Sequence, residues 1–101
     1  MEQQILSVAD LSVDLSSHMV RREGREIFLT AREYALLELL LRNRGQVLSR
    51  EEIASALWDE DYDGGTNIVT VYINYLREKI DSDFPRKLIH TVRGSGYVLD
   101  A

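Results

Sequence analysis

The chain has 101 residues, of which 45% are apolar, so it can build one hydrophobic core and has no room for a second. It contains no cysteine, which excludes disulfides and thiolate metal sites and fits a reducing cytosol. Seventeen acids against 12 bases give a net charge of −5, which argues against a simple basic nucleic-acid binder. No signal peptide and no apolar run of about 20 residues is present, so we expect a soluble, cytoplasmic domain.

The first part of the chain has β-type rather than helical periodicity. Four short runs alternate with turn residues at Ser16–His18 and Glu23–Gly24, where the glycine supplies the positive φ of a tight hairpin. The runs are Ile5–Val8, Leu11–Leu15, Met19–Arg22 and Arg25–Leu29. They predict a small antiparallel sheet with one face packed and the other in solvent.

Two capping boxes, Thr30–Glu33 and Ser49–Glu52, mark the beginnings of two helices. Leucines at three- and four-residue spacing follow the first box, and Arg42–Gly45 ends that helix with basic residues and a glycine. Ile53 and Leu57, with Trp58 as a further candidate, are predicted to supply the buried side of the second helix. A third helix is predicted for Asn67–Ile80, so the middle of the chain is a three-helix segment.

The Asn67–Ile80 helix has two distinct faces when it is plotted at 100° per residue. One narrow arc is apolar and belongs to the core, with Tyr72 at its edge: Val69, Ile73, Leu76 and Ile80. The opposite arc suits contact with base edges and thymine methyls: Asn67, Val71, Asn74 and Glu78, with Ile68 and Tyr75 at one margin. The alternative is that Ile68, Val71 and Tyr75 simply cover core or a neighbouring loop.

The chain ends in two β-type runs, Lys87–Thr91 and Tyr97–Leu99, which predict a hairpin with Arg93 at its tip. Gly94 and Gly96 let the backbone at this tip approach a partner closely. An arginine in that place can enter a narrow minor groove, although many exposed arginines have no specific role. A helix that fits one groove beside a hairpin that reaches the next is typical of duplex DNA recognition.

The acidic stretch that precedes the third helix, which begins at Asp59 and continues through Asp61, Asp63 and Gly64, resembles the first half of a calcium-binding loop. Its twelfth position should be a glutamate but is Thr70, so we expect a solvated connector or a protein-contact surface instead. His18 and His90 are far apart, and no nucleophile or phosphate-loop motif is present. We therefore expect no enzyme activity, no metal and no cofactor.

Together these segments resemble the winged-helix output domain of OmpR/PhoB-family bacterial response regulators. The resemblance extends from about Ile5 to Leu99, and its most specific part is the Thr91–Tyr97 sequence T-V-R-G-S-G-Y after the third helix. It implies an α+β fold, a winged helix-turn-helix with an N-terminal four-stranded antiparallel sheet, three helices and a C-terminal β-hairpin wing. Residues 1–101 would form one domain, ordered from about 5 to 99, without the family's receiver domain.

By motif position, the resemblance assigns site residues in three groups. The base-facing residues are Ile68, Val71 and Tyr75, with Arg93 in the minor groove. The residues that contact or support the DNA backbone are Asn67, Tyr72, Asn74, Arg77, Thr91, Gly94 and Tyr97. The loop Trp58–Thr66 corresponds to the loop that touches RNA polymerase in some members, which here includes Trp58, Asp59, Glu60, Asp61 and Asp63.

The resemblance implies transcriptional control within a two-component phosphorelay, with an upstream receiver domain in the full-length protein. Isolated domains would be monomeric and would pair on direct-repeat half-sites. One departure is that Asn67 and Asn74-Tyr75 stand where many members carry arginines, so we expect weaker and less salt-sensitive DNA binding. The acidic balance leaves a protein-interaction winged helix as the alternative.

Overall fold

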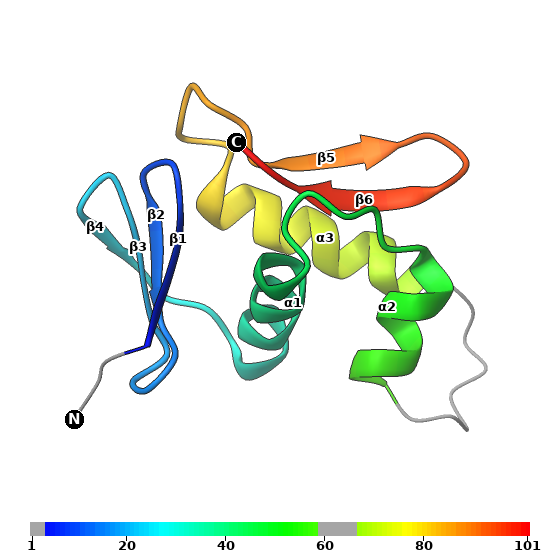
Figure 1. Ribbon diagram of the computed structural model, residues 1–101, viewed down its shortest axis with the longest axis horizontal. Helices are drawn as coiled ribbons and strands as arrows, with labels where there is room; N and C mark the ends of the chain where they lie inside the picture. The colour runs from blue at the N-terminus through cyan, green and yellow to red at the C-terminus, as the bar shows by residue number, and fades with distance from the viewer. Residues whose placement is uncertain (1–3, 59–66) are drawn as a thin grey trace.

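The computed structural model describes residues 4–58 and 67–101, and Figure 1 shows two small sheets with three helices packed between and beneath them. The chain forms β1 (Ile5–Val8), β2 (Leu11–Asp14), β3 (Met19–Arg22), β4 (Arg25–Ile27), α1 (Ala31–Arg42), α2 (Arg50–Leu57), α3 (Asn67–Ile80), β5 (Ile89–Val92) and β6 (Gly96–Leu99). This order confirms the predicted winged helix-turn-helix. None of the described helices has the length and apolarity that a membrane span requires.

The N-terminal sheet is antiparallel in the order β1-β2-β3-β4, as predicted. Both predicted turns are present, and His18, Glu23 and Gly24 have positive φ values of 65°, 52° and 75°. The second strand ends at Asp14 rather than Leu15, because the Asp14 carboxylate accepts hydrogen bonds from two backbone amides and turns the chain. The fourth ends at Ile27 rather than Leu29.

Both capping boxes form as the sequence predicts. In each box the hydroxyl accepts from the backbone amide of the glutamate, and the glutamate accepts from the amide of the capping residue. Glu33 of the first box also accepts a 2.6 Å hydrogen bond from Lys79 on α3. Burial opposes ionisation of Glu33, but the bonds from Lys79 and the Thr30 amide outweigh it and lower its pKa. The cap of α1 thus also fastens this helix to α3.

The apolar arc of α3 lies at the centre of the core. Val69, Ile73, Leu76 and Ile80 are fully buried, which confirms the helical-wheel prediction. Helix α1 packs Leu36, Leu37 and Leu40 into the same cluster, and the sheet adds Val8, Leu11, Val13 and Val20. Because one arc of α3 is buried in the core, its opposite arc faces outward.

A buried arginine joins the N-terminal sheet to the end of α3. Arg22 has no exposed surface, and it pairs with Asp10 at 2.8 Å and with Asp81 at 2.9 Å. Its guanidinium also donates to the carbonyls of Ile80 and Arg86 and lies 4.7 Å from the centre of the Phe84 ring. The hydrogen bond from Arg22 holds the pKa of Asp10 below its usual value.

Asp81 carries this connection onward to the wing. Its carboxylate accepts from the backbone amides of Leu88 and Ile89 at 3.1 and 3.0 Å. The Lys87 ammonium donates hydrogen bonds to carbonyls of the α3–β5 connection, including that of Asp81 at 2.8 Å. Strand β5 begins at Ile89 and not at Lys87 as predicted. Asp81 and Lys87 thus fix the residues that lead into the strand.

We predict that Asp81→Asn lowers the free energy of unfolding by about 3–5 kcal/mol, because it leaves the buried Arg22 without its inner counter-charge. Urea denaturation followed by circular dichroism measures this change. Asp83→Asn removes an exposed carboxylate two residues away and should change stability by less than about 0.5 kcal/mol. Equal midpoints for the two variants would contradict a structural role for the pair.

Candidate nucleic-acid interface

The outward arc of α3 presents a small mixed surface. Val71 and Tyr75 are 39% and 47% exposed, and Asn74 is also exposed. Val71 and Tyr75 are therefore not covered by the core, and whether they meet the neighbouring loop lies outside the described residues. The alternative that these apolar residues only cover core holds in part for Ile68, which is half-buried and packs against the core. Asn67 is the first residue of α3.

Tyr72 lies at the boundary between the core and this arc. It is half-buried, with its ring 5.4 Å from the Trp58 ring and 5.6 Å from the Tyr75 ring, each in an edge-to-face arrangement. Tyr72 is thus in contact with two other residues of the predicted site. Its ring packs beneath the exposed Tyr75, which makes it a supporting residue of the surface.

Arg77 and Thr91, two predicted DNA-backbone residues, are bonded to each other. The Arg77 guanidinium donates to the Thr91 hydroxyl at 2.7 Å and to the Ile89 carbonyl at 3.2 Å. It also lies 5.8 Å from the centre of the Tyr97 ring. The Tyr97 hydroxyl is 3.2 Å from that of Thr70, and Tyr97 is only 7% exposed. The side chains of Arg77 and Thr70 on α3 and of Thr91 and Tyr97 on the hairpin thus hold the β5–β6 hairpin against α3.

The tip of the hairpin projects beyond this contact. Arg93 and Gly94 are exposed, and the turn is closed by a 2.9 Å hydrogen bond from the Ser95 amide to the Val92 carbonyl. Gly94 has a φ of 76°, a conformation that favours glycine. The base of the hairpin is packed much more tightly, because a Cβ at Gly96 would lie 1.9 Å from the Leu48 carbonyl oxygen.

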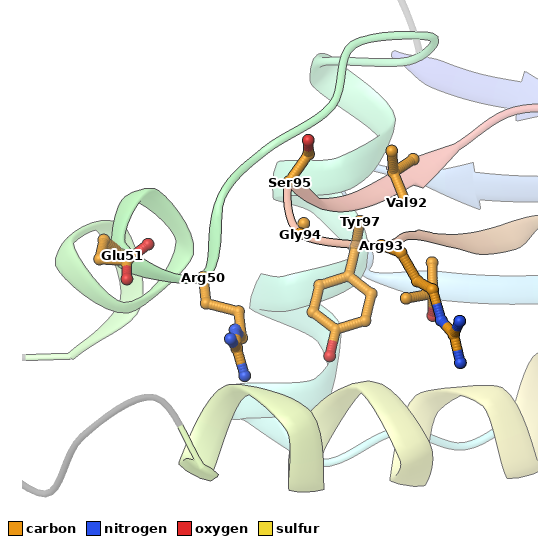
Figure 2. Close-up of a pocket in the computed structure, with 9 residues that line it drawn as sticks. Arg50, Glu51, Val92, Arg93, Gly94, Ser95 and Tyr97 are labelled. Carbon is orange, nitrogen blue, oxygen red and sulfur yellow. The ribbon is translucent and has the colours of Figure 1, made fainter.

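Figure 2 shows a hollow between the hairpin and the start of α2, with the side chains of Arg50, Tyr97 and Arg93 extending toward α3. The hollow has a volume of about 280 Å³ and is lined by Arg50, Glu51 and residues 91–97. Sequence reasoning placed Arg50 in a capping box and missed it as a site residue. One signal was available: a basic residue in the first turn of a helix opposes the helix dipole and is unfavourable there.

The predicted polymerase-contact loop is only partly described. Trp58 is half-buried at the end of α2, and its backbone amide bonds to the Ala54 carbonyl at 2.8 Å. Asp59, Glu60, Asp61 and Asp63 lie outside the described residues. Within residues 4–58 and 67–101, no three His, Cys, Asp or Glu side chains are grouped closely enough to hold a metal.

Known proteins resemble this chain in both sequence and structure. Residues 24–99 match the family model "Transcriptional regulatory protein, C terminal". The chain is 50% identical over 96 residues to the transcriptional regulatory protein PcoR of Escherichia coli, covering 95% of this chain and 42% of PcoR. It is 54% identical over 93 residues to CusR of Escherichia coli K12, covering 92% of this chain and 41% of CusR.

A solved structure with the same fold is the RstA DNA-binding domain of Klebsiella pneumoniae in complex with the RstA box. It superposes with a TM-score of 0.84 at 28% identity, over 96% of this chain and 97% of that one. The chain spans less than half the length of PcoR and CusR. The family model and the solved structures lead to the same conclusion. The chain belongs to the OmpR/PhoB family of winged-helix DNA-binding domains found at the C terminus of transcriptional regulatory proteins.

Proposed function

We propose that this domain binds duplex DNA sequence-specifically and controls transcription as the output half of a two-component response regulator. The observation that carries the proposal is that α3 has an exposed arc and that the exposed Arg93 at the hairpin tip extends its side chain toward the same helix, as Figure 2 shows. An α-helix fits the major groove, and an arginine is favoured in a narrow minor groove. The family membership supports the same function.

In this proposal the residues on the two elements divide their roles. Val71, Asn74 and Tyr75 meet base edges in the major groove, and Ile68 and Asn67 lie at the entering end of α3. Arg93 enters the adjacent minor groove, and Gly94 lets the tip approach the duplex backbone. Tyr72, Arg77, Thr91 and Tyr97 support the recognition surface, and Arg50 adds a phosphate contact from the start of α2.

The remaining partners follow from the family. PcoR and CusR are more than twice as long as this chain, which supports a receiver domain upstream in the full-length protein. The site as proposed binds and does not catalyse, and it requires no cofactor. A regulator of genomic DNA in a bacterium works in the cytoplasm, which agrees with the absence of cysteine.

A protein-interaction winged helix is the competing function, and its supporting observation is the net charge of −5. Selection from random duplexes, followed by a gel shift with the isolated domain at low salt, separates the two. DNA binding predicts that one sequence is enriched and shifted. Failure to enrich any duplex at micromolar domain concentration would favour a protein partner.

We predict that Arg93→Ala weakens binding to the selected duplex by about 1–3 kcal/mol, because a specific groove contact is lost. Fluorescence anisotropy with a labelled duplex measures the loss. Arg21→Ala is the matched control, since Arg21 is an exposed arginine on β3, which Figure 1 shows at the far end of the molecule from the hairpin. An equal loss for both variants would mean that only overall charge matters.

We also predict that the free domain sediments as a monomer and that two domains occupy direct-repeat half-sites roughly 10 bp apart, one helical turn. This spacing places both domains on the same face of the duplex. Lengthening the spacer by about 5 bp moves one half-site to the opposite face and should abolish joint occupancy. A tight dimer in the absence of DNA would contradict the prediction.

The loop Trp58–Thr66 is proposed to contact RNA polymerase. Four carboxylates repel phosphate, so the loop should face away from the duplex and be available to a basic partner. We predict that replacing Asp59, Glu60, Asp61 and Asp63 by Asn or Gln leaves DNA affinity unchanged or slightly higher but reduces transcription by the full-length protein from its own promoter. Normal activation by the substituted protein in a reconstituted transcription assay would leave the loop a simple connector.

A further inference from the structure

Three aromatic rings form a continuous series from the end of α2 to the outward arc of α3. Trp58 contacts Tyr72 with ring centres 5.4 Å apart and planes at 62°, and Tyr72 contacts Tyr75 at 5.6 Å and 76°. Edge-to-face packing of this kind is the arrangement that aromatic rings prefer. Trp58 and Tyr72 are half-buried, whereas Tyr75 is 47% exposed. The series therefore leads from two half-buried rings to an exposed ring on the proposed DNA surface.

The inner end of the series is held by Arg32 of α1. Its guanidinium lies 5.0 Å from the centre of the Trp58 ring, a cation–π contact. The same group donates a hydrogen bond to the carbonyl of Leu57, the last residue of α2. Arg32 thus fixes both the Trp58 ring and the backbone beside it, and α1, α2 and α3 all contribute to the support of one exposed side chain.

An exposed side chain normally samples several rotamers, and ordering it on binding lowers affinity. A Tyr75 ring that is already packed against Tyr72 loses less freedom when it meets DNA. We propose that Arg32, Trp58 and Tyr72 are positioning residues that hold Tyr75 for base contact. This inference rests on the proposed DNA-binding function, and it assigns Trp58 a role in DNA affinity that is separate from polymerase contact.

The test is a double-mutant cycle on the selected duplex, measured by anisotropy. Trp58→Leu should weaken binding by about 2- to 10-fold when Tyr75 is present, the factor expected for ordering one side chain. In a Tyr75→Ala background the same change should have no effect, because nothing is left to position. Trp58→Phe keeps an aromatic ring beside Tyr72 and should restore most of the affinity.

Arg32→Met provides a second variant should Trp58→Leu fail to fold, and it should likewise act only when Tyr75 is present. Arg42→Met is its matched control, since Arg42 is an exposed arginine on the same helix that pairs with Glu38 at 2.8 Å. Equal losses of DNA affinity in both Tyr75 backgrounds, or no loss in either, would overturn this inference and leave the proposed function standing. Failure of the unsubstituted domain to bind any selected duplex would overturn the proposed function and this inference with it.

Discussion

The relative placement of the N-terminal sheet, α3 and the β5–β6 hairpin depends on one buried ion pair, Arg22–Asp81. A buried guanidinium loses its hydration, a cost of several kcal/mol that only close counter-charges and hydrogen bonds offset. Here Arg22 has two carboxylates and two carbonyls as acceptors. Asp81 in turn bonds the amides at the start of β5. Because these hydrogen bonds must all form together, the hairpin has one position relative to α3. The position of Arg93 at the hairpin tip is fixed in the same way.

The polar residues of the winged end serve two separate purposes. Arg77, Thr91 and Tyr97 bond or stack with one another between α3 and the hairpin, so they set the geometry of the interface. Arg93 and Arg50 extend toward α3 from the hairpin and from the start of α2, and in the proposed complex they contact a groove and phosphate. A domain with an acidic surplus can still bind DNA in this way, because screening within about 10 Å makes local charge matter more than net charge.

The outward arc of α3, which is the proposed DNA-contact surface, is also supported by neighbouring side chains. Tyr75 is exposed, yet its ring has a defined packing partner, Tyr72, which is supported in turn by Trp58. Where relatives with arginines in this helix gain affinity from phosphate charge, this domain would rely on ordered contact surface. Such contacts are less sensitive to salt and more sensitive to shape, so under the proposed function its target preferences would differ from those of such relatives.

Local sequence signals determined the elements and their faces. The two capping boxes, the turns at His18 and Gly24 and the apolar arc of α3 all depend on residues a few positions apart, so they could be identified from the chain alone. The two β-type runs at the end of the chain also predicted the final hairpin, and the family resemblance added the winged-helix topology. What only the tertiary structure decided is which polar groups meet: Arg22 finds Asp81 across 59 positions, and Arg50 lies beside the hairpin. No local pattern around Arg22 indicates that it will meet a carboxylate, because such pairings depend on how whole elements pack.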